Sequence, residues 1–559
     1  MFDTNALSSV RTLPEALGIT PSYLLVCLAS CMGLALLSCK FVAATFKSPA
    51  SPQKLRDPVP GIYNTLQFML NNHKFMTRAQ AALQRGRHSI LRFSLGPKTV
   101  YLVAGQQNVR AVFGRDLVHD VTNQDQMTRY ALPTLYKMNP AEVRRWEADR
   151  SGVMKTPIPG TEDVPARQRL WYNYEHIYAE YLGKPQYMKP LIKRYDDNLQ
   201  RVLSSYPLDE WSSVSVQKLC RDEVTRTLVN TLFGPRLMEL NPDFVDRLWA
   251  FDEQVFQLVM GLPKWLNSKP AKAHDAYVDP IERWLEYASS GFDWDAADAE
   301  ADWEPRFGGR AVRELYRWMK ETDWRNEVIA ATLGALVFAL NSNSVPTTMW
   351  MLMEIIKDPD LLQAIREEVS TATTTDADSG KLVFEHQKVV ALPLLQSIWT
   401  ETLRLRINFN IVRDVKQPVT LDNGNTTIEK GALIQVPMMV AHYDESVWGA
   451  ADHPASEFWA ERHIRYSGGE RKYVMAGHPA AYFPFGGGAN ICPGRQLAKH
   501  EIFTTAATIV SRFELEVLGW TNPADGSHSD RAAESDLRYC GAGAMPPDRD
   551  LKVRWKRIR

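Results

Sequence analysis

The stretch FPFGGGANICPGRQLA, residues 483–498, places a single cysteine, Cys492, between three glycines and an expected helix. Glycine opens backbone conformations that other residues avoid, so amide N–H groups can turn toward the sulfur. Pro493 suits the first position of a helix, and the helix dipole there favours a thiolate. The pattern is that of a cysteine that ligates a metal. The alternative is an inert cysteine in a glycine-rich turn, because free cysteine commonly behaves as a small hydrophobic residue.

The same glycines do not form a phosphate-binding motif. A dinucleotide fingerprint that starts at Gly486 and Gly488 requires a third glycine at the position of Ile491, and the lysine of a P-loop is missing. With one cysteine and no nearby histidine, the remaining metal ligands must come from outside the protein. A haem brings four nitrogen ligands of its own, so one axial thiolate is sufficient.

The letters FGGGANICPG around the cysteine resemble the haem-binding signature of the cytochromes P450, Phe-x-x-Gly-x-Arg-x-Cys-x-Gly. The match falls on Phe485, Gly488, Cys492 and Gly494. The resemblance implies haem b, iron protoporphyrin IX, with Cys492 as its axial thiolate ligand and the other matched residues beside the cofactor. Asn490 also belongs to this site, but the family commonly has an arginine or histidine there that reaches a haem propionate.

A second motif of the family lies upstream. Glu401 and Arg404 have the Glu-x-x-Arg spacing that puts two side chains on one helix face. The spacing recurs elsewhere in the chain, but only this pair is followed by a segment that resembles the family's Pro-Glu-Arg-Phe region, where Arg462 would complete a structural triad. Arg413 matches a position that often binds a haem propionate. The family's Trp-x-x-x-Arg motif is not recognisable near Trp171.

The longest expected helix runs from residue 325 to 357 and is apolar on nearly every side, yet its centre reads ALNSNSVPTT. Pro346 has no N–H for the carbonyl of Ser342, so the helix should open or kink there. The family usually has an acid and a threonine here that guide protons to dioxygen. The resemblance makes Ser342 and Asn343 the catalytic positions, with Ser342 in place of the acid and Asn343 in place of the threonine. A proline kink whose polar groups are satisfied by neighbours is the alternative.

Asn343 followed three residues later by proline, with an uncharged residue two before the cysteine, is similar to the branch that contains sterol 7-alpha-hydroxylases and prostacyclin synthase. The resemblance implies a haem-thiolate monooxygenase that uses O2 and NADPH-derived electrons. Its substrate would be a lipophilic small molecule, such as a terpenoid, a steroid-like compound or another secondary metabolite, held near residues 339–347 and 407–412. The alternatives are a haem-thiolate isomerase or dehydratase that needs no reductase, and a non-catalytic membrane haem-binding protein.

Composition narrows the choice of partners. The 559 residues include 65 basic and 65 acidic ones, so no net charge attracts nucleic acid. The length leaves no room for a fused diflavin reductase, and the resemblance implies a separate NADPH–cytochrome P450 reductase, with cytochrome b5 as a second candidate. Arg495 and Lys499 are candidates for the docking surface, and solvated charges on a helix face are the alternative.

An apolar stretch near the N-terminus predicts a membrane anchor. Residues 22–39 carry no charge and approach the ~20 residues that cross a bilayer. Lysines follow this stretch, so the positive-inside rule places residues 1–21 in the lumen and the catalytic part in the cytoplasm. A cleaved leader or a buried hairpin is the alternative. With the anchor, the resemblance implies a single-pass protein of the endoplasmic reticulum membrane in contact with the lipid bilayer.

A tether with basic residues and four prolines spans residues 40–62, and one haem-thiolate catalytic domain is expected at 63–559. Helical periodicity dominates this part, with strand patterns at 89–105 and 418–439 and a turn at Asn423 and Gly424. The fold class is therefore mainly α with small antiparallel β-sheets (α+β), and the resemblance implies the cytochrome P450 fold. Residues 258–270 fall where the family often has a membrane-dipping entry loop; a buried helix end is the alternative.

Overall fold

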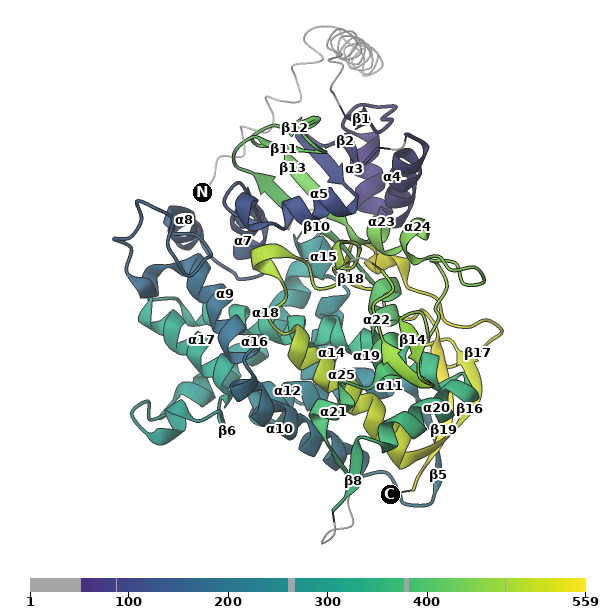
Figure 1. Ribbon diagram of the computed structural model, residues 1–559. Coiled ribbons are helices and arrows are strands. Elements are labelled where there is room, and N and C mark those ends of the chain that lie inside the picture. The colour runs from purple at the N-terminus through teal and green to yellow at the C-terminus, as the bar shows by residue number, and fades with distance from the viewer. Residues whose placement is uncertain (1–51, 87, 260–266, 377–381, 478, 559) are drawn as a thin grey trace, which may run out of the picture. The chain divides into compact units, whose positions relative to one another are not determined.

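The computed structural model describes residues 52–558 except 87, 260–266, 377–381 and 478 (Figure 1). The predicted luminal segment 1–21, the anchor 22–39, most of the tether and the centre of the 258–270 segment lie outside the described residues. The chain forms two compact units. One contains the residues up to Leu102 and the segment Thr420–Ile428, and the other contains Val103–Val419 and Glu429–Arg559.

The smaller unit combines two helices with short strands. Its elements are β1 (Gln53–Lys54), α3 (Tyr63–Leu70), α4 (Asn72–Gly86), β2 (Ile90–Leu95), β3 (Lys98–Val103), β11 (Val419–Leu421) and β12 (Thr426–Ile428). β1 pairs with β2 in parallel, so the ordered structure reaches into the segment predicted as tether, and one strand pair departs from the expected antiparallel pattern. The turn predicted at Asn423 and Gly424 is present, and both residues have positive φ angles, 54° and 90°.

The larger unit is mostly helical. Its long helices are α8 (Pro140–Ala148), α9 (Leu170–Tyr181), α10 (Pro185–Leu203), α12 (Thr225–Phe233), α14 (Phe244–Asp252), α16 (Lys269–Ser289), α17 (Arg310–Glu321), α18 (Asn326–Ser342), α19 (Ser344–Ile356), α20 (Pro359–Ser370), α22 (Pro393–Arg406) and α25 (Arg495–Arg512). α25 follows the glycine-rich loop and packs against α10, α19 and α20 (Figure 1). The helix after Cys492 is thus held in the core, which fixes where the loop ends.

The strands of the larger unit form small antiparallel sheets. β10 (Ile407–Val415) pairs with β13 (Leu433–Pro437), with β18 (Ala542–Ala544) and with β4 (Val121–Thr122). A second sheet has the order β17-β16-β19-β5, from His528–Ser529, Phe513–Thr521, Asp550–Arg557 and Trp211–Ser215. β10 therefore joins the region of Arg413 to the chain's C-terminal segment. The helix-rich fold with small sheets agrees with the predicted class.

The expected central helix is divided in two. α18 ends at Ser342 and α19 begins at Ser344, with Asn343 between them at φ −107° and ψ −40°. Pro346 lies in the first turn of α19, where its missing N–H costs no helical hydrogen bond. The predicted opening at Ser342 is confirmed. Within the part of the chain that the structure describes, Asn326–Ile356 alone is long and apolar enough to span a membrane, and 72% of its most apolar window is buried inside the protein.

Candidate active site

The loop before Cys492 depends on its glycines. Gly486 and Gly488 have φ angles of 75° and 70°, in the region that favours glycine. A Cβ atom at Gly487 would lie 2.4 Å from Cδ2 of Phe113, and one at Gly488 would lie 3.0 Å from the Phe113 carbonyl oxygen. The loop therefore passes against Phe113 closely enough to exclude side chains. Cys492 N donates to Phe485 O at 2.9 Å and closes the loop.

The Cys492 thiol is partly buried, and its burial raises its pKa. Hydrogen bonds from the backbone of Gly494 and Arg495 to the sulfur act in the opposite direction, as does the Arg495 charge. The amides thus face the sulfur as the sequence suggests. The helix, however, begins at Arg495 with Gly494 as its N-cap. Pro493 lies outside the helix because Gly494 is the N-cap, so its predicted place as the first helical residue is wrong.

Two basic side chains next to the cysteine are engaged within the chain. Arg495 Nη1 donates to the Cys492 carbonyl oxygen at 2.9 Å. Lys499 Nζ donates to Gln396 Oε1 at 2.9 Å and lies 5.2 Å from the ring centroid of Trp399. Burial lowers the pKa of Lys499 to about 8. Neither side chain is a freely solvated charge.

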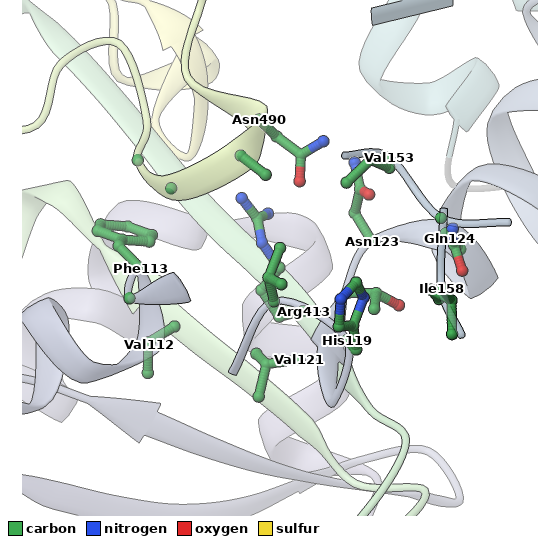
Figure 2. Close-up of a pocket in the computed structure, with 17 residues that line it drawn as sticks. Val112, Phe113, His119, Val121, Asn123, Gln124, Val153, Ile158, Arg413 and Asn490 are labelled. Carbon is green, nitrogen blue, oxygen red and sulfur yellow. The ribbon is translucent and has the colours of Figure 1, made fainter. Parts of the chain in front are cut away.

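Beside the loop is a small cavity that opens to the solvent. Arg413 and Asn490 both line it, and Figure 2 shows the Arg413 guanidinium pointing toward the Asn490 side chain. Arg413 is only 9% exposed, and burial lowers its pKa to about 10. Its one hydrogen bond among the described residues is from Nη1 to the Val412 carbonyl oxygen at 3.0 Å. A buried cation thus borders the cavity without an ion pair.

Glu175 is a residue of this site that the sequence did not reveal. It lies on α9, and its Oε1 accepts a hydrogen bond from Asn490 Nδ2 at 3.0 Å. Burial raises the pKa of Glu175, while the Asn490 hydrogen bond and the charge of Arg413 oppose the rise. Glu175 follows Trp171 by four residues, so a carboxylate stands at the spacing where the family's arginine was sought. The glutamate in place of the expected arginine was the signal that the sequence offered for this residue.

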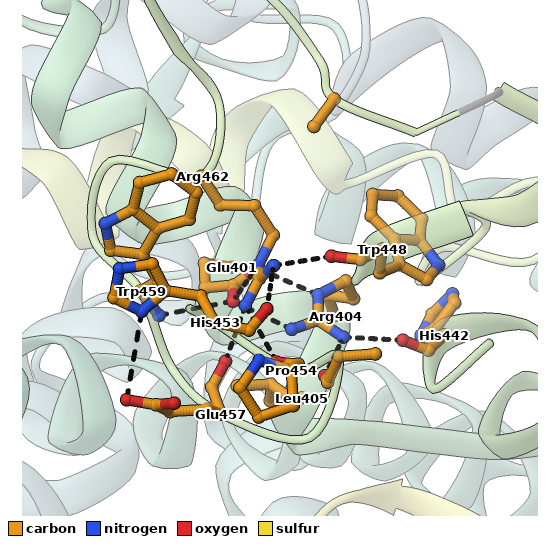
Figure 3. Close-up of polar contacts among 12 residues, drawn as sticks. Glu401, Arg404, Leu405, His442, Trp448, His453, Pro454, Glu457, Trp459 and Arg462 are labelled. Atoms are coloured by element: carbon orange, nitrogen blue, oxygen red, sulfur yellow. Dashed lines mark hydrogen bonds and ion pairs between the residues drawn. The ribbon is translucent and has the colours of Figure 1, made fainter. Parts of the chain in front are cut away.

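Glu401, Arg404 and Arg462 lie together in the interior (Figure 3). Glu401 and Arg404 are both 0% exposed, and two hydrogen bonds join them, Arg404 Nε to Oε2 at 2.8 Å and Nη2 to Oε1 at 2.7 Å. Arg462 Nε donates to Oε1 at 2.7 Å. Burial alone would raise the pKa of Glu401, but hydrogen bonds from Arg404 and His463 and the charges of both arginines lower it to about 2.

The two arginines also bind a long loop segment. Arg404 Nη1 donates to the carbonyl oxygens of His442 and Ala455, both at 2.6 Å. Arg462 Nη2 donates to the carbonyl oxygens of Pro454 at 3.1 Å and Glu457 at 2.9 Å (Figure 3). The cluster therefore ties this segment to α22, the helix that leads directly into β10 and Arg413.

The break between α18 and α19 is anchored to the C-terminal segment. Asn343 Oδ1 accepts a hydrogen bond from the backbone N of Ala544 in β18 at 3.0 Å, and its Nδ2 lies 3.4 Å from Ser342 Oγ. A Cβ atom at Gly543 would lie 2.8 Å from the same Oδ1. The amide oxygen of Asn343, one of the two predicted catalytic positions, is thus bound within the protein. Ser342 and Asn343 do not line the cavity beside Arg413.

One face of α18 stays accessible although the helix is in the core. In its C-terminal half, Ala335, Phe338, Ala339 and Ser342 are not fully buried, and their spacings of three and one place them on the same side. Leu340 is also partly exposed but lies on another side, and Asn343 follows at the break. The face is apolar along α18 and becomes polar at the break.

A family model described as Cytochrome P450 matches residues 52–530. The chain belongs to the cytochrome P450 family. It is 38% identical over 531 residues, 95% of this chain and 97% of the relative, to Cytochrome P450 monooxygenase calL of Penicillium decumbens. It is 29% identical to Cytochrome P450 monooxygenase fsoE of Humicola fuscoatra, over 90% of this chain and 87% of that protein. Cholesterol 7-alpha-monooxygenase of Cricetulus griseus is 30% identical over 240 residues, 41% of this chain and 45% of its own.

This P450 is accordingly a monooxygenase, an oxidoreductase of a family that binds haem through a thiolate and takes electrons from a redox partner. Because these relatives are monooxygenases, the alternative of a non-catalytic haem-binding protein is excluded.

The site residues fit the cofactor. One sulfur faces backbone amides, and a buried guanidinium borders a cavity next to the same loop. Among the described residues, no group of three or more His, Cys, Asp or Glu side chains could hold a metal ion.

Proposed function

We propose that this P450 uses O2 and NADPH-derived electrons to hydroxylate or oxidatively rearrange a lipophilic small molecule, with haem b held by Cys492. The observation that carries the proposal is the glycine loop, which Cys492 N closes with a hydrogen bond to Phe485 O at 2.9 Å and which leads into α25 at Arg495. The N-terminus of that helix favours the negative charge of a thiolate, which is the form that ligates iron. When bound, haem supplies the iron chemistry that oxidises the substrate.

Arg413 would bind a haem carboxylate, because it is a buried guanidinium that borders the cavity and makes no ion pair within the described chain. Phe485 and the glycines would hold the Cys492 loop in the position that the cofactor requires. Glu401, Arg404 and Arg462 would keep this architecture rigid from α22 onward, since their hydrogen bonds tie a loop segment to that helix.

Ser342 is the residue to which we assign proton handling. Its hydroxyl is partly exposed at the break between α18 and α19 and can both donate and accept. Asn343 is assigned a positioning role, because its amide oxygen is bound by Ala544 N. Family members that lack an acid at this position include enzymes that isomerise a substrate, so a reductase-independent isomerase or dehydratase is the second candidate.

The substrate is proposed to be a terpenoid, a steroid-like compound or another secondary metabolite. Support comes from the apolar accessible face of α18 and from Phe409 in β10, which is 40% exposed. One relative adds to this, because it is a cholesterol 7-alpha-monooxygenase and so acts on a steroid.

Electrons are proposed to come from NADPH–cytochrome P450 reductase, with cytochrome b5 as a further candidate, at the endoplasmic reticulum membrane. The apolar residues 22–39 would form the anchor. Exposed apolar side chains at the start of the described chain support contact with a bilayer. Ile62, Leu66 and Leu70 are 53%, 52% and 81% exposed and recur at intervals of four, on one face of α3.

The test is the absorption spectrum of the reduced carbon monoxide complex of the full chain. We expect the long-wavelength Soret band of a thiolate ligand, and we expect Cys492→Ser to lose it while the far-ultraviolet circular dichroism stays unchanged. A folded wild-type protein without the band would overturn the proposal. Turnover of a substrate with peroxide alone, and none with NADPH, reductase and O2, would favour the second candidate.

A further inference from the structure

The carboxylate of Glu175 and the amide of Asn490 connect two distant parts of the chain at the edge of the cysteine loop. Asn490 lies at the end of the short helical turn Gly488–Asn490, two residues before Cys492. Its Nδ2 donates to Glu175 Oε1 at 3.0 Å, across 315 residues of sequence. α9 is held to the core by Trp171, whose indole N–H donates to the Trp146 carbonyl oxygen at 3.0 Å. The loop that carries the iron ligand is thus bonded to a fixed helix.

The pair also sets the charge around the cavity. Among the described residues that line it, Arg413 is the only arginine or lysine. Burial lowers the pKa of Arg413, and the charges of Glu175 and Asp414 oppose this change. Asp414 is held in place by Gln126, whose Nε2 and backbone N donate to it at 2.8 and 3.1 Å. Asn490 carries no charge, and its side-chain amide donates a hydrogen bond to Glu175. The charges of two carboxylates therefore act on a single buried cation.

The carboxylate of Glu175 also lies next to the ligand loop. Its Oε1 is 3.0 Å from Asn490 Nδ2, and Asn490 is two residues before Cys492. Charges interact strongly in a poorly hydrated site, so the local potential depends on Glu175. The potential of a haem iron responds to charge and hydrogen bonds around its ligand.

We infer that Glu175 is a positioning and tuning residue of the haem site, which clamps the cysteine loop through Asn490 and lowers the reduction potential of the iron. The inference rests on the proposed haem-thiolate function. The hydrogen bond holds the ligand loop against α9, and the carboxylate favours the more highly charged ferric state over the ferrous state.

Two substitutions separate the charge from the bond. Glu175→Gln removes the charge and keeps an oxygen that can accept from Asn490, whereas Asn490→Leu removes the bond and keeps the carboxylate. Glu180→Gln on the same helix is the control, since Glu180 is paired with Lys184 at 2.5 Å. The measurements on the haem-loaded full chain are the ferric/ferrous midpoint potential and the rate of haem transfer to apomyoglobin.

Glu175→Gln is expected to shift the ferric/ferrous equilibrium about tenfold toward ferrous, which is ~59 mV for a one-electron couple. Asn490→Leu is expected to release haem roughly tenfold faster, as the loss of a charge-assisted hydrogen bond implies. Both variants should keep the thiolate Soret band, and Glu180→Gln should match the wild type in both measurements.

The outcomes are distinct from those that test the function. If the wild-type complex lacks the thiolate band, the proposed function fails and the inference falls with it. If the band is present, but Glu175→Gln has the potential of Glu180→Gln and Asn490→Leu releases haem at the wild-type rate, the inference is refuted and the function stands. If Asn490→Leu does not fold, an unshifted potential in Glu175→Gln refutes it.

Discussion

Replacing Glu401 with glutamine would leave two buried guanidinium groups without their counter-charge. Glu401 is 0% exposed and accepts hydrogen bonds from Arg404 and Arg462 at 2.7–2.8 Å. Breaking a buried ion pair by removing one partner typically costs about 3–5 kcal/mol. The pKa of Glu401 gives an independent figure. A fall from 4.5 to about 2 corresponds to roughly 3 kcal/mol at about 1.4 kcal/mol per pKa unit. We expect Glu401→Gln to destabilise the fold by this amount.

The assay is the temperature at which the folded circular dichroism signal is lost, at one fixed heating rate because unfolding of a large chain is commonly irreversible. At about 2.1 cal/mol/K per residue, a chain of 559 residues has an unfolding entropy of about 1.2 kcal/mol/K. A loss of ~3–5 kcal/mol then lowers the midpoint by about 3–4 °C. The haem-free and haem-loaded chains should show the same direction of change.

The matched control is Glu223→Gln, because Glu223 and Arg226 share the Glu-x-x-Arg spacing and neither is fully buried. Water screens charges at such partly exposed positions, so the expected loss is at most about 1 kcal/mol. Equal midpoints for the two variants would refute the reasoning that burial, and not spacing, gives Glu401 its importance.

The low pKa of Glu401 also predicts a pH dependence with a definite sign. A carboxyl group whose folded-state pKa lies below its unfolded value stabilises the fold above the unfolded value. This contribution is lost as pH falls from about 4.5 to about 2. The stability difference between the wild type and Glu401→Gln should therefore shrink over that window, and a constant difference would contradict the linkage.

Three further predictions concern the loop and the helix break. Gly487→Ala should lower haem content, because the added Cβ would lie 2.4 Å from the Phe113 ring. Phe113→Ala in the same chain should restore part of the haem content. The measurement is the haem-to-protein absorbance ratio. Asn343→Thr should keep haem but lose the hydrogen bond to Ala544 N. Thermal unfolding should show a loss of about 1–3 kcal/mol in stability. The amount of product formed per NADPH consumed should also change. Ser342→Ala should keep the thermal midpoint within about 1 °C while lowering product per NADPH, since only a hydroxyl is removed; unchanged coupling would exclude Ser342 from proton handling.

The sequence by itself determined the features that depend on neighbouring residues. The turns of Gly486 and Gly488 and the hydrogen bonds from Gly494 and Arg495 to the sulfur arise within about ten residues of Cys492. The division of the central helix near Ser342 also follows locally, because a proline removes a backbone donor four residues beyond the carbonyl that needs it. Even here the start of the helix after Cys492 was placed two residues too early.

Tertiary structure alone decided which partners the polar side chains use. Asn343 binds Ala544 across 201 residues, and Asn490 binds Glu175 across 315. Periodicity reports which residues share one face of a helix, but not which distant segment packs against that face. Asn343 was therefore predicted to be catalytic although Ala544 N binds its amide oxygen, and the glutamate in place of the family's arginine did not reveal its bond to Asn490. Whether a side chain is free to act on a substrate or is bound within the protein depends on the packing of elements, and no run of neighbouring residues encodes that packing.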